Sequence, residues 1–323
     1  MKTTKHRNGD ATAPRSDGEN TAQSQSSNQS KRCRNNYDKI AIPRQDLHNM
    51  MLLGSGEFGE VYLAQANGLQ GNSETVVMVK ALQHMRDENL LQEFKRQLDM
   101  FGRLDHCNIA KLLGICNDME PHYMILQYTD WGDLKQFLVA TRKEGTPSKP
   151  RPTPLTVSQN MSIIHQIALA MEHLANHRMV HKDLAARNCL ISSDLSVKVS
   201  LSALCKDTYS KEYSLHKNQI IPLRWLPLEA VEEDDYSCKS DVYSFAVTVW
   251  EIFSRGEMPF SRMTDQEVLS LLERGDLHWK HHKTTPESLK QLLSKCWETS
   301  PRDRPTFSQI AVQVGDSNLV NNV

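Results

Sequence analysis

The hydrophobic pattern changes near Thr129, and this change constrains the fold more than any other feature of the sequence. Before it, short apolar runs bounded by turn residues predict strands at 50–63, 75–82, 110–116 and 123–128, with one helix at 89–104. After it, apolar residues recur at helical spacing and predict helices at 157–176, 239–254, 265–273, 286–297 and 306–314. The sequence therefore predicts an α+β, bilobal architecture, with a β-rich N-lobe, a larger helical C-lobe and a ligand cleft between them.

The composition excludes several kinds of partner and site. The formal net charge is -1, which gives no indication of a nucleic-acid partner. The seven cysteines are scattered and show no ligand spacing, so we expect reduced thiols and no zinc site. No run of 18 or more apolar residues occurs, so no membrane span is predicted and we expect this chain alone to be cytoplasmic.

The first 36 residues contain no Val, Ile, Leu, Phe, Trp or Tyr. Such a segment cannot bury enough apolar area to offset its ordering entropy, so a disordered basic tail is predicted. Its cluster Lys31-Arg32-Cys33-Arg34 suits contact with an anionic membrane surface, and a solvated linker is the alternative. Ordered sequence is predicted from near Ile40. The predicted domains are a tail at 1–46, an N-lobe at 47–127, a C-lobe at 128–316 and a C-terminal tail at 317–323.

A glycine-rich turn lies between the first two predicted strands. Residues 53–61 read L-G-S-G-E-F-G-E-V, and the glycines are Gly54, Gly56 and Gly59. Glycines at this spacing let a hairpin backbone close over phosphate groups without a Cβ in the way. A turn without a ligand is the alternative, whereas a dinucleotide-binding turn would open a helix.

The most specific motif is H-K-D-L-A-A-R-N at 181–188. In active protein kinases the aspartate of this motif accepts the substrate hydroxyl proton, and the asparagine five residues on holds a metal ion. The L-A-A-R-N form resembles tyrosine kinases, as do P-L-R-W at 222–225, S-D-V-Y-S-F-A-V at 240–247 and C-W-E-T-S-P-R-D-R-P-T-F at 296–307. The resemblance covers about 47–316. It implies a protein-kinase fold with structural roles for Asp241 and for a pair of Glu229 with Arg304.

Several positions depart from what phosphoryl transfer requires. Leu201 begins Leu-Ser-Ala where the metal-binding D-F-G is expected, and leucine offers no oxygen to Mg²⁺. Lys80 is present, but its expected helix partner is Gln97, an amide that supplies no charge. Lys182 replaces an arginine and lacks its planar fork. We therefore expect no metal site and no active catalytic residues, leaving Asp183, Asn188 and Lys182 as remnants.

Met78 stands in V-M-V-K at 77–80, where a small alanine leaves room for adenine in the kinase pattern. Its three additional heavy atoms can fill that space, or the unbranched side chain can swing aside. No cofactor is expected, and ATP binding is expected to be weak or absent. The degenerate nucleotide site is predicted to comprise Gly54, Gly56, Gly59, Val61, Met78, Lys80, Gln97 and Leu126.

Five further stretches resemble one group of kinases. They are E-P-H-Y-M-I-L-Q-Y at 120–128, G-D-L-K-Q-F-L at 132–138, the run at 170–190, V-K-V-S at 197–200 and G-E-M-P at 256–259. The group is the receptor pseudokinase family called off-track in insects and protein tyrosine kinase seven in vertebrates. The resemblance implies an immunoglobulin-like ectodomain and one membrane span, and we predict neither within these 323 residues. It also implies Wnt, planar-polarity and semaphorin–plexin signalling at the cytoplasmic face of the plasma membrane, with cytoplasmic signalling proteins and co-receptors as partners.

Three functions are compatible with these residues. The first is a catalytically impaired scaffold that recruits cytoplasmic partners. The second is a weak tyrosine kinase that uses Asp183, Asn188 and Lys80, and the third is an ATP-binding sensor without catalysis. Tyr209 and Tyr213 lie between the degenerate metal motif and P-L-R-W, so we predict that another kinase phosphorylates them. Ordinary loop tyrosines are the alternative.

Overall fold

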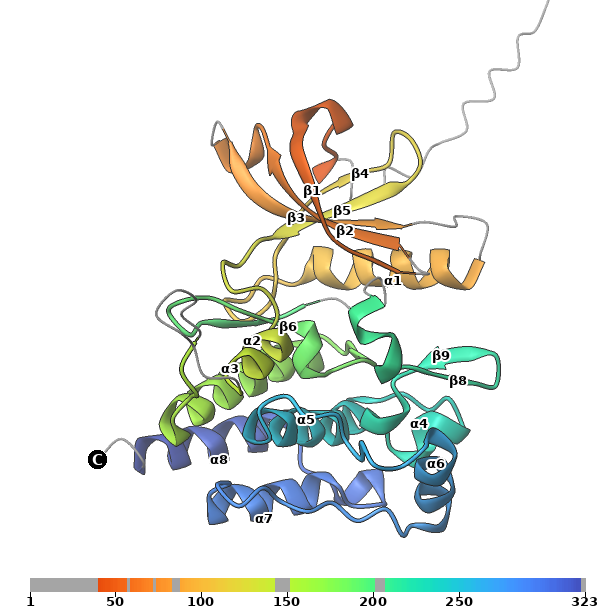
Figure 1. Ribbon diagram of the computed structural model, residues 1–323, viewed down its shortest axis with the longest axis vertical. Coiled ribbons are helices and arrows are strands. Elements are labelled where there is room, and N and C mark those ends of the chain that lie inside the picture. The colour runs from red at the N-terminus through yellow and green to blue at the C-terminus, as the bar shows by residue number, and fades with distance from the viewer. Residues whose placement is uncertain are drawn as a thin grey trace, which may run out of the picture. The chain divides into compact units, whose positions relative to one another are not determined.

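An antiparallel sheet with one long helix forms the N-lobe in the computed structural model (Figure 1). The structure describes residues 40–56, 59–71, 74–82, 88–142, 152–200 and 207–320. The five strands lie in the order β1-β2-β3-β5-β4. The bounds are β1 Leu47–Gly56, β2 Gly59–Ala66, β3 Thr75–Leu82, α1 Glu88–Arg103, β4 Leu112–Cys116 and β5 His122–Gln127.

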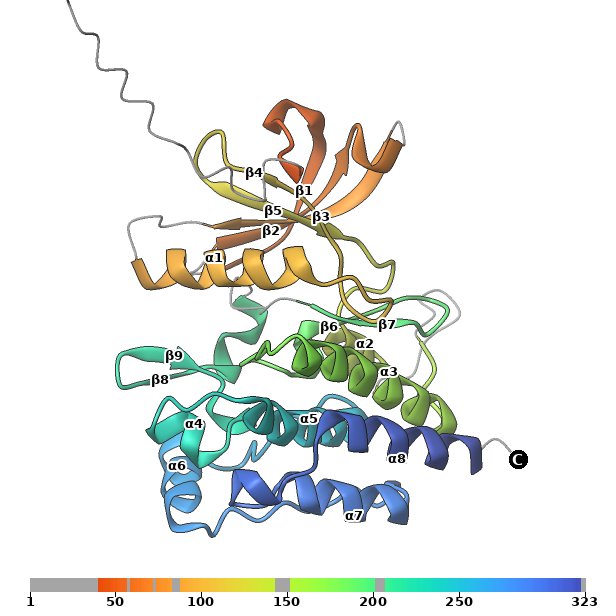
Figure 2. The ribbon, with the colours of Figure 1, turned by 180° about the vertical axis from the view of Figure 1, so that it is seen from behind.

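Helices build the C-lobe, and two short hairpins lie on the side facing the sheet (Figures 1 and 2). The helices are α2 Leu134–Ala140, α3 Val157–Asn176, α4 Leu228–Glu232, α5 Cys238–Phe253, α6 Asp265–Arg274, α7 Glu287–Cys296 and α8 Phe307–Val320. The hairpins pair β6 Cys189–Ile191 with β7 Val197–Val199, and β8 Ser214–His216 with β9 Gln219–Ile221. Short 3₁₀ turns include η4 Ala186–Asn188, η5 Asp207–Glu212 and η6 Leu223–Trp225. The predicted α+β, two-lobed architecture is confirmed.

Helices α3 and α5 form the centre of the C-lobe, and both begin at capping boxes. The Thr156 hydroxyl accepts from the Gln159 amide at 3.2 Å, while the Gln159 side chain accepts from the Thr156 amide at 2.9 Å. Ser237 and Ser240 exchange the corresponding bonds at the start of α5. These bonds satisfy backbone N–H groups that a helix start leaves unpaired. Most of both helices is buried in one large apolar cluster, which fixes the loop between α3 and β6.

The structure brings Glu229 and Arg304 together, as the kinase resemblance implied. Arg304 Nη1 lies 2.5 Å from Glu229 Oε1, and Nη2 lies 3.2 Å from Oε2. The same guanidinium donates to the carbonyls of Lys239, Glu298 and Thr299. Arg304 is 2% exposed, so this fork joins α4, α5 and the turn before α8 in a setting with little water.

Both predicted ends of the folded domain need correction. Residues 40–46 were assigned to the tail, but Ile42 N donates to Ile115 O at 2.8 Å. A Cβ on Gly114 would lie 2.1 Å from Ile42 Cδ1, so this close packing requires glycine at 114. Residues 40–46 therefore belong to the folded domain, and α8 continues to Val320, beyond the predicted end at 316. Residues 1–39 lie outside the described part. No helix among the described residues is both long and apolar enough to cross a membrane.

We expect Arg304→Ala to lower the free energy of unfolding by about 3 kcal/mol, because it leaves the largely buried Glu229 carboxylate without its cation. The measurement is urea denaturation followed by tryptophan fluorescence. Arg302→Ala is the matched control, because Arg302 is exposed two residues away and should change stability by less than about 0.5 kcal/mol. Equal effects of the two substitutions would contradict a structural role for the pair.

Candidate active site

The loop after α3 is held in place by a buried aspartate on α5. Asp241, 2% exposed, accepts from the backbone amides of His181 at 2.7 Å and Lys182 at 3.0 Å. Burial raises the pKa of this carboxyl, while His181 and its amide hydrogen bond lower it. The His181 ring lies 2.8 Å from Ser200 O, which connects the loop to the end of β7. Lys182 adopts a φ of 73°, and its ammonium lies 4.6 Å from the centre of the Tyr236 ring.

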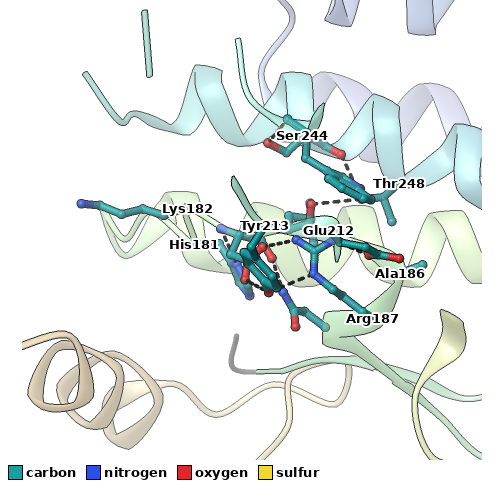
Figure 3. Close-up of polar contacts among 12 residues, drawn as sticks. His181, Lys182, Ala186, Arg187, Glu212, Tyr213, Ser244 and Thr248 are labelled. Atoms are coloured by element: carbon teal, nitrogen blue, oxygen red, sulfur yellow. Dashed lines mark hydrogen bonds and ion pairs between the residues drawn. The ribbon is translucent and has the colours of Figure 1, made fainter. Parts of the chain in front are cut away.

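Asp183, the predicted proton acceptor of an active kinase, has hydrogen bonds at both carboxylate oxygens, and the two donors, Arg187 and Tyr213, are labelled in Figure 3. Arg187 Nη2 lies 2.5 Å from Oδ1, and the Tyr213 hydroxyl donates to Oδ2 at 2.7 Å. Arg187 Nε donates in turn to the Tyr213 hydroxyl at 2.9 Å. Tyr213 belongs to the segment that follows the degenerate metal motif. The chain's own tyrosine therefore lies where the hydroxyl group of a substrate would have to approach the aspartate.

Glu212, the residue before Tyr213, is bound by two buried cations. Its carboxylate lies 2.9 Å from Arg187 Nη1 and 3.1 Å from Lys135 Nζ. Lys135 also contacts Glu251 Oε1 at 2.6 Å, and Glu251 Oε2 accepts from Ala186 N and Trp225 Nε1 at 2.9 Å each. Burial opposes the charge of Arg187, but Asp183, Tyr213 and Glu212 raise its pKa well above the ordinary value. The network thus binds the Tyr209–Tyr213 segment to α2, to α5 and to the loop at 181–188, which we call the catalytic loop.

Tyr209 is held in the same way at the start of α2. Its side chain is 3% exposed, and its hydroxyl donates to Asp133 Oδ1 at 2.5 Å. The same oxygen accepts from Gln136 N at 2.9 Å, so Asp133 also caps α2. Burial and the neighbouring Asp133 charge raise the pKa of Tyr209 far above its usual range. Both predicted regulatory tyrosines therefore contact carboxylates, and a kinase would reach them only after this segment opens.

Strand register brings the predicted nucleotide-site residues together on the N-lobe sheet. Val61 pairs with Gly54 on β1 and with Lys80 on β3, while Met78 pairs with Leu126 on β5. Lys80 Nζ donates to Gln97 Oε1 at 3.0 Å, and both side chains are buried. At this position of α1 the lysine therefore meets a neutral amide, which supplies no charge. The other two predicted glycines, Gly56 and Gly59, pair with each other at the hairpin end.

The residues present do not fit the magnesium ion of a protein kinase. Asn188 Nδ2 donates to Asp183 O at 2.5 Å, while its Oδ1 is buried and has no hydrogen-bond partner among the described residues. That single neutral oxygen is a weak ligand for a hard dication. Leu201, in place of the metal-binding aspartate, lies outside the described residues and has no side-chain oxygen. Within the described ranges, no group of three or more His, Cys, Asp or Glu could hold a metal.

Sequence reasoning missed part of this network. It singled out Asp183, Tyr209 and Tyr213, but it did not single out Lys135, Glu212, Glu251 or Asp133. The one available signal was the acidic residue directly before Tyr213. Lys135 and Glu251 lie 116 residues apart, and local patterning gives no indication that they meet. Arg187 appeared only as a letter of the L-A-A-R-N motif, without a role.

The fold and these motifs define a protein kinase domain, and comparison agrees. A family model described as protein tyrosine and serine/threonine kinase matches residues 47–314, so the chain belongs to this family. Within it, the chain is 49% identical to inactive tyrosine-protein kinase 7 of Gallus gallus and 48% identical to that of Homo sapiens, each over 87% of this chain and 26% of the relative. It is 36% identical to tyrosine-protein kinase-like otk of Drosophila melanogaster, over 90% of this chain and 35% of the relative.

These relatives confirm the predicted resemblance to the off-track and protein tyrosine kinase seven group. The chain spans about a quarter of the length of the vertebrate relatives and about a third of the insect relative. The similarity therefore describes the kinase-like part, and the functions of the longer proteins require separate argument.

We expect Glu212→Gln to loosen the Tyr209–Tyr213 segment. Lys135 and Arg187 both bind the Glu212 carboxylate, and a neutral amide in its place removes the negative charge that they share. A loss of about 1.4 kcal/mol corresponds to tenfold more frequent opening, so trypsin should cleave after Lys211 about tenfold faster. Mass spectrometry of timed digests measures the rate. Glu233→Gln is the control, since Glu233 is exposed and follows the last residue of α4, outside the Tyr209–Tyr213 segment. An unchanged cleavage rate in Glu212→Gln would contradict the conclusion that the Glu212 carboxylate holds this segment closed.

Proposed function

We propose that this chain is a tyrosine pseudokinase, a folded scaffold that recruits cytoplasmic signalling proteins and transfers no phosphate. The observation that carries the proposal is the closed Asp183 carboxylate, bound by Arg187 and by the chain's own Tyr213. Each carboxylate oxygen keeps a further lone pair, but Tyr213 lies where a substrate hydroxyl would approach, so proton transfer to Asp183 requires this tyrosine to be displaced. The word "inactive" in the names of the vertebrate relatives supports the same conclusion.

The chain also lacks part of the positive charge that an active kinase places around the phosphate being transferred. A kinase stabilises the developing charge with metal ions and with a lysine that is positioned by a glutamate. Here Lys80 is paired with the Gln97 amide, and Leu201 supplies no metal ligand. Removing one preorganised electrostatic contact typically lowers the rate by ~10²–10³, and two such contacts are changed here. Weak kinase activity is therefore the less favoured function.

The cellular setting that we propose follows the family resemblance. The chain would act as the kinase-like part of a receptor at the cytoplasmic face of the plasma membrane, in Wnt, planar-polarity and semaphorin–plexin signalling. Its partners would be cytoplasmic signalling proteins and co-receptors, and its basic tail would contact anionic lipid. An ATP-binding sensor is a second candidate, because Gly54, Val61 and Lys80 remain adjacent in the sheet.

The direct test is a radiolabel assay of the purified chain with Mg-ATP and a generic tyrosine peptide. We expect incorporation at the level of the blank, and Asp183→Asn should leave that level unchanged. A matched preparation of an active tyrosine kinase shows that the assay detects transfer. Measurable incorporation that falls at least tenfold in Asp183→Asn would establish catalysis by this site and overturn the proposal.

Nucleotide binding is tested separately by thermal unfolding. We expect no shift in the melting temperature of the wild-type chain with millimolar ATP, with or without Mg²⁺, because Met78 occupies the place of a small residue. Met78→Ala should open that space and produce an ATP-dependent rise, since ligand at 100 times its Kd stabilises by about 2.7 kcal/mol. Val76→Ala, an exposed change on the same strand, is the control. A rise of several degrees in the wild type would favour the sensor.

A further inference from the structure

Three histidine rings stack on one another where the N-lobe meets the C-lobe. The ring centres of His106 and His173 are 4.9 Å apart, and those of His173 and His177 are 4.3 Å apart. His106 belongs to the loop between α1 and β4, whereas His173 lies in the last turn of α3 and His177 caps the end of that helix. The stack therefore connects the two lobes, with His173 in the middle.

The loop between α1 and β4 is also hydrogen-bonded to the C-lobe. Ala110 N donates to Val199 O, and Val199 N donates to Asn108 O, each at 2.8 Å. The Asn108 side-chain amide donates to Val197 O at 3.0 Å and to Gln166 Oε1 at 3.1 Å. These bonds join the loop to β7 and to α3, so opening of the loop loosens a connection between the lobes.

The hydrogen bonds of the stacked rings suit neutral imidazole. His106 Nδ1 lies 3.1 Å from Asn108 N, and because a backbone amide only donates, this nitrogen accepts and carries no proton. His177 Nδ1 lies 2.8 Å from His173 O, and because a carbonyl only accepts, this nitrogen carries the proton. His173 Nε2 is buried and has no hydrogen-bond partner among the described residues. A proton added there would be buried without an acceptor, which is unfavourable.

The surroundings of His106 also favour its neutral form. Burial lowers the pKa of His106, and the Lys198 charge on β7 lowers it further, whereas the Glu172 carboxylate on α3 raises it. The Lys198 ammonium is held near the ring because it donates to the carbonyl of Cys107, the next residue in the sequence. The nearby cation thus acts in the same direction as burial.

His173 is affected mainly by burial and by the two rings that flank it. Burial lowers the pKa of His173, and His177 and His106 lower it further, whereas the Asp105 carboxylate of the loop raises it. A histidine with a lowered pKa binds protons more readily once its surroundings have opened. The closed arrangement is therefore most stable above the ordinary histidine pKa of about 6.5, and its stability is lost as the pH falls below that value.

We propose that the stack of His106, His173 and His177 is a pH-sensitive contact between the lobes, which holds the loop between α1 and β4 against α3 while the rings are neutral and releases it when they take up protons. Two effects of protonation act together. Stacked cationic rings repel one another, and a protonated His106 can no longer accept from Asn108 N. This inference goes beyond the proposed recruitment function and does not depend on it.

The test is hydrogen exchange of the full chain, measured by mass spectrometry on peptides that cover 104–111. Each rate is divided by the intrinsic exchange rate of an unstructured peptide at the same pH. In the wild type this loop should open about threefold more often at about pH 6.0 than at about pH 7.5, because opening is coupled to proton uptake. In His173→Gln the ratio should fall below about twofold, because glutamine does not titrate. His278→Gln, which removes an exposed histidine between α6 and α7, should keep the wild-type ratio.

A second measurement follows the rings themselves and uses an exposed position, His177, so that the variant keeps its fold. Histidine side chains labelled with a carbon isotope are titrated by nuclear magnetic resonance. The pKa of His173 should lie below its ordinary value in the wild type and should move back toward it in His177→Gln, because one neighbouring cation is absent.

Three results would overturn the inference. The first is an equal pH dependence of exchange in the wild type and in His173→Gln. The second is an equal effect of His278→Gln, which would indicate a general response of the chain to acid. The third is an unchanged pKa of His173 in His177→Gln, a result that decides the question even where His173→Gln does not fold.

Discussion

The buried guanidinium of Arg187 is the charge on which the catalytic loop and the following segment depend. Its side chain has no exposed surface, and it lies between Asp183, Glu212 and the ring of Trp225. Removing such a cation from water costs several kcal/mol, and only nearby anions with good hydrogen-bond geometry offset that cost. Asp183 is one of those anions. The residue that would accept a proton in an active kinase therefore has a structural function here, as the counter-ion of Arg187.

Lys135 extends this dependence to the rest of the C-lobe. It contacts Glu212 and Glu251, and Glu251 is fully buried with hydrogen bonds to the catalytic loop and to Trp225. Two cations thus serve three carboxylates, and loss of any member would leave a buried charge without compensation. The Glu229–Arg304 pair and Asp241 lie outside this network and hold α4, α5 and the loop after α3. The fold can persist through these contacts without any requirement for catalysis.

The sequence predicted those parts of the structure that depend on local pattern or on a motif. The N-lobe strands and the longer helices followed from apolar spacing, whereas the short α2, α4 and the β8–β9 hairpin were not predicted. The meetings of Lys80 with Gln97 and of Glu229 with Arg304 followed from motif positions. The contact of Tyr209 with Asp133 spans 76 residues and leaves no periodic signal, so it was not predicted. Order was predicted from near Ile40, but the domain bounds left residues 40–46 in the tail, since the sequence gives no local signal of where they pack. Their contacts to β4 depend on the absence of a side chain at Gly114.

The closed segment also links the loss of catalysis to regulation. Tyr209 and Tyr213 each donate to a carboxylate, and Tyr209 is almost fully buried, so their access to an external kinase depends on the free energy of opening. A phosphate on either hydroxyl would place two negative charges beside Asp133 or Asp183, which favours the open state. Phosphorylation would therefore shift the population toward the open segment, because the carboxylate that binds the unmodified tyrosine repels the phosphate. The contacts that close Asp183 would then also determine how readily the segment is released.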